Sequence, residues 1–120
     1  MSTILVIEDL PDNALLARRV LSAYGHEVIE ANTAESGLDM AITHKPDLIL
    51  LDLGLPDADG QTIVGIIRQY PDIADVPIIV FTAWPEETAR QMVEAYGCNG
   101  YIRKPLSVVD LTQTIAQHIR

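Results

Sequence analysis

Four apolar runs along the sequence are each followed, at once or after one residue, by a polar side chain. Paired in chain order, they are 4–7 with Glu8 and Asp9, 48–51 with Asp52, 78–81 with Thr82, and 101–102 with Lys104. In the first three runs the apolar residues are consecutive, which is typical of strands buried on both faces of a parallel sheet. The carboxyl ends of neighbouring parallel strands lie on one edge, where open α/β folds bind ligands. The sequence therefore predicts that three carboxylates, a hydroxyl and an amine meet in one pocket.

The segments between these runs have the apolar spacing of helices. Strands are predicted at 3–7, 27–31, 48–51, 76–81 and 99–102, and helical spacing covers 17–24, 34–42, 63–70, 89–96 and 108–115. Gly25 and Gly97 stand where C-terminal helix caps are expected, and Ser107 with Asp110 has the spacing of a capping box, so the last helix should begin near 107. Parallel strands need crossover connections, which are right-handed. We expect a doubly wound α/β fold with a five-stranded parallel sheet in a three-layer sandwich.

Length and charge exclude several classes of protein. The 120 residues leave room for one domain, spanning 1–120. The net charge of -9 repels phosphate backbones and argues against a nucleic-acid partner. No apolar run approaches the roughly 18 residues of a membrane span, and no basic segment precedes the first strand, so we expect a cytoplasmic protein that does not act on membranes. Cys98 is the only cysteine and is expected to be a small buried hydrophobe.

The acidic residues at the strand ends favour a metal site. Glu8, Asp9 and Asp52 would repel one another when ionised, and a bound hard cation would relieve that repulsion. Mg²⁺ prefers oxygen ligands, uses one or two carboxylates and keeps several waters, which suits a shallow cluster at a sheet edge. Any one of these acids alone would be an ordinary surface group. Three of them at matching strand ends favour a site.

Lys104 and Thr82 add the groups that phosphate chemistry needs. An ammonium group in an acidic pocket offsets its charge and can pair with a phosphate oxygen. A threonine hydroxyl can donate to another phosphate oxygen. A carboxylate can attack phosphorus and form an acyl phosphate, with a metal ion neutralising the developing charge. Asp52 is the candidate nucleophile.

Taken together, these residues and their separations resemble the receiver domains of two-component response regulators over the whole chain. The segments that carry the resemblance are Glu8-Asp9, Pro46 to Pro56 with Gly60, Thr82-Ala83, and Tyr101 to Pro105. The resemblance implies a flavodoxin-like sandwich with strand order 2-1-3-4-5. It also implies a cis peptide bond before Pro105, which X-Pro bonds adopt at low cost.

The resemblance also implies a role for each residue of the pocket. Asp52 would accept a phosphoryl group from a histidine kinase or a histidine phosphotransfer protein. Glu8, Asp9, Asp52 and the carbonyl of Gly54 would hold Mg²⁺, and Thr82 and Lys104 would contact the phosphoryl group. Such a protein is not an enzyme beyond promoting its own phosphorylation and dephosphorylation.

A conformational switch follows from the same resemblance. Phosphorylation would draw the Thr82 hydroxyl inward and free space for the ring of Tyr101. The fourth helix, fifth strand and fifth helix would then present the change to a downstream protein partner. Because the fifth helix ends at Arg120, we expect a stand-alone receiver; a receiver excised from a longer protein is the alternative. Gly54 and Trp84 flank the pocket and are expected to influence how long the phosphate survives.

Two other classes of protein share this fold. A flavodoxin-like cofactor protein needs a phosphate loop rich in Gly, Ser and Thr after its first strand. Here residues 8–13 contain Glu8, Asp9 and Asp12, which suit a cation and oppose a flavin phosphate. A phosphorylation-independent interaction module would keep the fold without the chemistry, and the intact set of Asp52, Thr82 and Lys104 argues against it.

Overall fold

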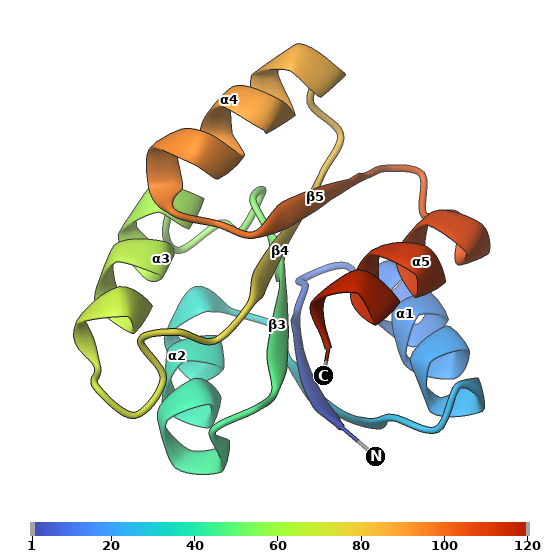
Figure 1. Ribbon diagram of the computed structural model, residues 1–120, viewed down its shortest axis with the longest axis horizontal. Helices are drawn as coiled ribbons and strands as arrows, with labels where there is room; N and C mark the ends of the chain where they lie inside the picture. The colour runs from blue at the N-terminus through green and yellow to red at the C-terminus, as the bar shows by residue number, and fades with distance from the viewer. Residues whose placement is uncertain (1, 120) are drawn as a thin grey trace.

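A five-stranded parallel sheet lies at the centre of the computed structural model, which describes residues 2–119 (Figure 1). Its strands are β1 Thr3–Ile7, β2 Glu27–Ala31, β3 Leu48–Asp52, β4 Ile78–Thr82 and β5 Gly100–Arg103, in the order β2-β1-β3-β4-β5. The helices that alternate with them are α1 Pro11–Ala23, α2 Ala34–His44, α3 Gly60–Gln69, α4 Glu86–Tyr96 and α5 Val108–His118. The predicted doubly wound α/β fold and its strand order are confirmed.

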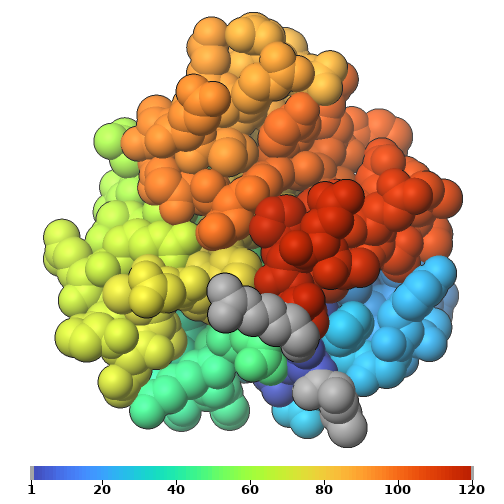
Figure 2. Space-filling model, viewed as in Figure 1, coloured from blue at the N-terminus to red at the C-terminus, as the bar shows by residue number. Residues whose placement is uncertain are grey.

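Helices cover both faces of the sheet and so complete the three layers. In Figure 1, α1 and α5 lie on one side of the sheet and α2, α3 and α4 lie on the other. Ile4 and Val6 pack in the core cluster that contains α1 and α5, whereas Leu5 and Ile7 pack in the one that contains α2 and α3. Figure 2 shows α5 (red) directly beside α1 (blue) on the outside of the molecule. Because both faces are covered, the three central strands β1, β3 and β4 are apolar at consecutive positions.

The pairing of the strands brings their carboxyl ends level with one another. The last pairs in register are Ile7 with Leu51, Asp52 with Phe81, and Thr82 with Arg103. Glu8 follows Ile7 directly, so it leaves the sheet beside Asp52. Lys104 follows Arg103 in the same way. The polar residues predicted at strand ends therefore share one edge of the sheet.

Helix ends agree with the predicted caps and add two that the sequence reading did not identify. The Ser107 hydroxyl accepts a hydrogen bond from the Asp110 N–H at 3.3 Å, and α5 begins at Val108. Gly25 and Gly97 have φ angles of 88° and 75° just after α1 and α4, a conformation that glycine adopts without a steric penalty. Thr33 caps α2 and Asp59 caps α3 through their side-chain oxygens.

Three residues of the predicted apolar stripes lie at the surface instead of in the core. Tyr24, Tyr70 and Val108 are 62%, 42% and 47% exposed. In α3, helical spacing predicts that Ile66 faces the core, but Val64 is fully buried and Ile66 is only half-buried. Apolar residues surround Gly65 on both sides in the sequence, so spacing alone leaves the buried face of this helix undecided.

Two glycines allow helices to approach the sheet closely. A Cβ atom on Gly60, the first residue of α3, would lie 2.2 Å from Leu53 Cδ2. A Cβ on Gly37 of α2 would lie 2.7 Å from Ile7 Cδ1. Both separations are far shorter than a normal contact between carbon atoms. The position of Gly60 places α3 directly behind the end of β3.

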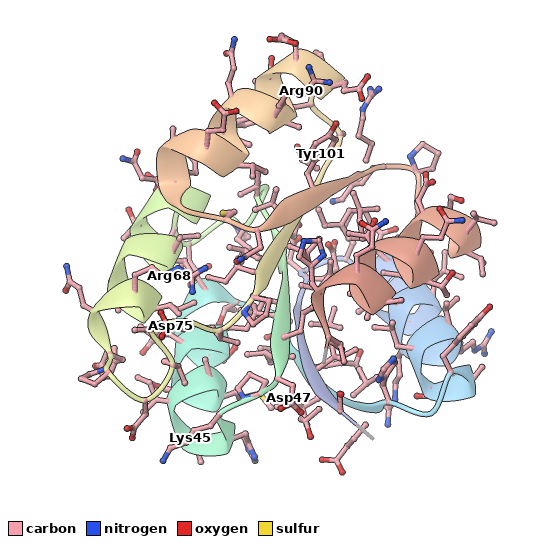
Figure 3. The ribbon with its side chains drawn as sticks, viewed as in Figure 1. Lys45, Asp47, Arg68, Asp75, Arg90 and Tyr101 are labelled. Atoms are coloured by element: carbon pink, nitrogen blue, oxygen red, sulfur yellow. The ribbon has the colours of Figure 1, made fainter. Side chains whose placement is uncertain are left out.

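Arg68 connects α3 with the segments at the amino ends of β4 and β5 (Figure 3). Its guanidinium donates to the carbonyl oxygens of Ala74, Val76 and Gly97 and to Asn99 Oδ1, at 2.6 to 3.3 Å. The neighbouring Cys98, predicted to be a small buried hydrophobe, is half-buried, and burial raises the pKa of its thiol to about 11. Within residues 2–119, none of the helices has the length and apolar character that spanning a membrane requires.

Candidate functional site

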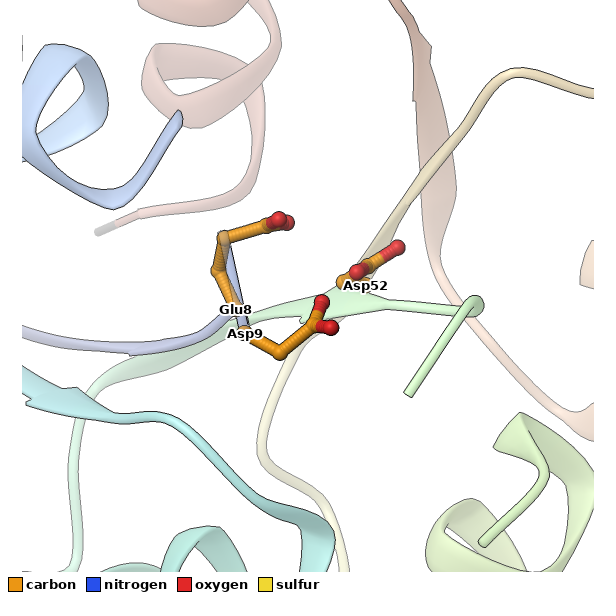
Figure 4. A group of neighbouring side chains, drawn as sticks. All are labelled: Glu8, Asp9 and Asp52. Atoms are coloured by element: carbon orange, nitrogen blue, oxygen red, sulfur yellow. The ribbon is translucent and has the colours of Figure 1, made fainter. Parts of the chain in front are cut away.

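Glu8, Asp9 and Asp52 form an acidic cluster at the carboxyl edge of the sheet (Figure 4). Glu8 and Asp9 follow β1, and Asp52 is the last residue of β3. One carboxylate oxygen from each residue lies within 4.8 Å of the others. Glu8 and Asp52 are each only 3% exposed, whereas Asp9 is half-buried. The strand register explains why Glu8 and Asp52 lie together, because Ile7 pairs with Leu51 and these two acids are the residues that follow the pair.

Lys104 places its ammonium group inside this acidic cluster. Lys104 Nζ lies 3.1 Å from Asp52 Oδ1 and 3.7 Å from Glu8 Oε2. The Phe81 ring, whose centroid is 4.9 Å from Nζ, lies beneath the ammonium group at the distance of a cation–π contact. The backbone of Lys104 is held by a hydrogen bond from its N–H to the Thr82 carbonyl oxygen at 2.8 Å. The peptide bond between Lys104 and Pro105 is cis.

The two oxygens of Glu8 have different surroundings. Oε1 accepts the Leu10 N–H at 3.2 Å and the Asn13 side-chain amide at 3.4 Å. Oε2 is buried and has no hydrogen-bond partner among the described residues. Burial, and secondly the nearby Asp52 charge, raise the pKa of Glu8 above its ordinary value, while Lys104 and the two hydrogen bonds oppose the rise. Ionised Glu8 therefore lacks part of the stabilisation that a buried carboxylate needs.

This donor set fits a hard divalent cation. The orphaned Glu8 oxygen is buried beside two further carboxylates, and together they supply the oxygen ligands that Mg²⁺ prefers. The single ammonium of Lys104 offsets only part of the negative charge of three acids. A divalent cation would satisfy the orphaned oxygen and neutralise the remaining charge. The residues present are therefore compatible with the predicted magnesium site.

One oxygen of Asp52 is held in place. Oδ1 accepts the Gly54 N–H at 2.9 Å as well as the Lys104 ammonium at 3.1 Å. No donor among residues 2–119 contacts Oδ2 within hydrogen-bond distance. Gly54 itself is exposed, and a Cβ atom there would lie 3.5 Å from Oδ1. The loop after β3 thus orients the carboxylate from one side and leaves the other side open.

Thr82 and Tyr101 lie near the cluster, but their hydroxyls have partners outside it. Thr82 is 2% exposed, and its Oγ1 accepts the Trp84 N–H at 3.0 Å. The Trp84 side chain is 44% exposed. Tyr101 donates its hydroxyl to Glu86 Oε1 on α4 at 3.0 Å, so its ring is turned toward the outer helix. The structure thus joins Glu8, Asp9, Asp52 and Lys104 in one cluster and leaves the Tyr101 hydroxyl outside it.

Three supporting residues were not identified from the sequence. Asn13 holds Glu8, and Phe81 lies against Lys104, as described above. Asp57, in the loop after β3, accepts the Ala34 and Glu35 N–H groups at the start of α2, at 2.9 and 3.1 Å. These hydrogen bonds, that from Ala34 above all, lower the pKa of Asp57. The strand register could have indicated Phe81, because it pairs with Asp52, whereas the contacts of Asn13 and Asp57 depend on loop paths that spacing does not reveal.

Comparison with known proteins gives consistent results. The family model described as the response regulator receiver domain matches residues 4–116. The polar-differentiation response regulator DivK of Brucella anthropi is 31% identical over 117 residues, which cover 98% of this chain and 95% of the relative. Each protein is thus matched over nearly its whole length.

Solved structures match the fold equally well. The chemotaxis protein CheY4 of Vibrio cholerae superposes with a TM-score of 0.93 at 24% identity, covering 99% of both chains. The receiver domain of the sensor histidine kinase PA1611 from Pseudomonas aeruginosa superposes with a TM-score of 0.88 at 28% identity, covering 98% of this chain and 96% of the other. That structure contains a magnesium ion coordinated in its active-site cleft.

Proposed function

The chain belongs to the response regulator receiver family, and from that premise we propose that it accepts a phosphoryl group on Asp52 and signals through phosphorylation-dependent protein contacts. The observation that carries this proposal is the contact between Lys104 Nζ and Asp52 Oδ1 inside a cluster of three carboxylates. A cation held against an acid in this way offsets negative charge in the unphosphorylated chain. In the phosphorylated chain it can pair with a phosphoryl oxygen.

The proposed reaction transfers a phosphoryl group from a phosphohistidine to Asp52. The Asp52 oxygen that no described donor holds attacks phosphorus and forms a new O–P bond. The P–N bond to the donor imidazole breaks, and the imidazole keeps the electron pair and takes up a proton. Gly54 N–H and Lys104 support this step because they fix the other oxygen of the same carboxylate. The chain promotes only its own phosphorylation and dephosphorylation.

Magnesium is the cofactor of this proposal. Glu8, Asp9, Asp52 and the carbonyl of Gly54 would hold it. When bound, the ion supplies electrostatic stabilisation of the charge on the transferred group. The Glu8 Oε2 oxygen supports this assignment, because it is buried and has no hydrogen-bond partner among the described residues, with only the Lys104 ammonium nearby at 3.7 Å.

Signalling would follow through Thr82 and Tyr101. We propose that the phosphoryl group attracts the Thr82 hydroxyl and that the ring of Tyr101 turns inward in response. The change would then be presented by α4, β5 and α5 to a downstream protein. The phosphodonor is a histidine kinase or a histidine phosphotransfer protein. The single domain over 1–120, the stand-alone state, the cytoplasmic location and the lack of nucleic-acid or membrane partners stay predictions from the sequence.

Phosphorylation by a small donor tests this proposal. Incubation with acetyl phosphate and Mg²⁺ should add one phosphoryl group to the wild-type chain, measured by intact-mass spectrometry. The same incubation with a chelator should give no addition. A wild-type chain that stays unmodified with both acetyl phosphate and a phosphohistidine donor would favour the phosphorylation-independent interaction module.

A further inference from the structure

The Tyr101 hydroxyl binds an acidic residue at the start of α4. It donates to Glu86 Oε1 at 3.0 Å, and the ring packs against the small core cluster of Leu53, Val80 and Met92. Figure 3 shows Tyr101 on β5 directed toward the helix that carries Arg90. The ring is thus held between β5 and α4, on the outer side of the sheet edge.

A neighbouring cation helps to fix the position of Glu86. Arg90 lies one turn along α4, with Nη2 3.6 Å from Glu86 Oε1 and Nη1 3.5 Å from Glu87 Oε2. Residues four apart on a helix face the same side, and the same Glu86 oxygen, Oε1, faces both Arg90 and the Tyr101 hydroxyl. Glu86 therefore contacts both Tyr101 and Arg90, while the contact of Glu87 is with Arg90.

We propose that the hydrogen bond between Tyr101 and Glu86 is a latch that keeps the ring of Tyr101 outward in the unphosphorylated chain. This inference rests on the proposed function, in which the inward turn of Tyr101 reports phosphorylation. For the ring to turn inward, the hydroxyl must leave Glu86. The latch therefore lowers the population of the inward ring in the unphosphorylated chain. In this way the latch opposes activation.

Linkage gives this idea a measurable consequence. If the phosphorylated pocket favours the inward ring, a variant that populates the inward ring more often must bind a phosphoryl mimic more tightly. Loss of the latch should then tighten binding without any change in the pocket itself. Glu86 is exposed and the bond competes with water, so we expect an effect of about fivefold, equivalent to about 1 kcal/mol.

Glu86→Ala and Glu87→Ala make a matched pair for the test. Both remove one exposed carboxylate from the first turn of α4 and one partner of Arg90, but only the first removes the acceptor of Tyr101. The probe is beryllium fluoride in saturating Mg²⁺, which mimics a phosphoryl group on a carboxylate, with the affinity measured by calorimetry. Amide NMR shifts of α4 and β5 in the free protein report how far the population has moved toward the bound state.

The latch predicts about fivefold tighter binding for Glu86→Ala, an unchanged affinity for Glu87→Ala, and a shift of the free Glu86→Ala spectrum toward the bound positions. In a Tyr101→Phe background, Glu86→Ala should have no further effect, because the donor is already absent. Equal effects of the two glutamate variants, or an undiminished effect of Glu86→Ala in the Tyr101→Phe background, would overturn the latch and leave the proposed function intact. A wild-type chain that does not bind the mimic would overturn the proposed function itself.

Discussion

Lys104, which follows β5, reaches across β4 to Asp52 at the end of β3, with Nζ 3.1 Å from Oδ1. The same ammonium is 3.7 Å from Glu8, so a single cation faces two buried carboxylates. Without a metal ion, the carboxylates of the pocket therefore repel one another, and the single ammonium group offsets only part of this repulsion. The predictions on metal binding and pH follow from it.

Replacing Asp9 with Asn should weaken magnesium binding by at least about tenfold, since a ligand carboxylate is lost. The fold should stay intact, and the melting temperature without magnesium should hold or rise because one of three crowded charges is gone. Calorimetric titration with Mg²⁺ and thermal unfolding measure the two effects. Asp12→Asn is the control, because Asp12 is an exposed acid in the first turn of α1. An Asp9→Asn chain that unfolds, or that binds Mg²⁺ like the wild type, would exclude the ligand role.

The raised pKa of Glu8 makes stability depend on pH. Burial first, and the charge of Asp52 second, raise this pKa above the ordinary value of 4.5. The folded chain therefore binds a proton more readily than the unfolded chain, and the free energy of unfolding falls as pH rises from 4.5 through the raised pKa. Glu8→Gln should remove this fall in metal-free buffer.

Denaturant unfolding at several pH values between 4.5 and about 7 measures the effect. Relative to wild type, Glu8→Gln should gain stability at about pH 7 and gain less near pH 4.5. Glu94→Gln, at an exposed position of α4, should leave the pH dependence of the free energy of unfolding as it is in the wild type. A Glu8→Gln gain that is the same at every pH would show that ionisation of Glu8 has no part in it.

Arg68 should contribute strongly to stability, because its guanidinium satisfies three carbonyl oxygens and the Asn99 side chain. Arg68→Met should lower the free energy of unfolding by about 2 to 4 kcal/mol, since partners at the amino ends of β4 and β5 lose their donors. Arg19→Met, at an exposed position of α1, should change it by less than about 0.5 kcal/mol. Urea unfolding of both variants gives the comparison, and similar small losses in the two would refute a connecting role for Arg68.

The sheet and the acidic cluster were predictable because each depends on a local and repeated pattern. Consecutive apolar residues such as Ile49 and Leu50 predict a strand covered on both faces, and parallel pairing then brings Asp52 beside Glu8. Contacts that depend on side-chain rotamers and on the paths of loops were not predictable. The outward direction of Tyr101 toward Glu86 and the hydrogen bonds from the start of α2 to Asp57 are of this kind.

Trp84 and Gly54 should set how long the phosphorylated form survives. Neither side chain offers an acceptor that orients an attacking water. Trp84 stands in the loop after Thr82, and its backbone N–H donates to the Thr82 hydroxyl. We expect Trp84→Ala to lose phosphate faster if the indole shields the pocket. Gly54→Asn should also lose it faster, because a side chain there begins 3.5 Å from Asp52 Oδ1 and carries an amide that can orient water. Decay of the phosphorylated mass with time measures both rates. An unchanged or slower loss from Trp84→Ala would be incompatible with shielding.

Covalent mapping of the phosphorylated residue tests the central claim most directly. After incubation with acetyl phosphate and Mg²⁺, borohydride reduction converts an aspartyl phosphate to homoserine, and peptide mass spectrometry then locates the converted residue. We predict conversion at Asp52 alone and no conversion in Asp52→Asn, whose fold should be unchanged. Conversion at Asp9 or at another acid, or undiminished labelling of Asp52→Asn, would contradict the account.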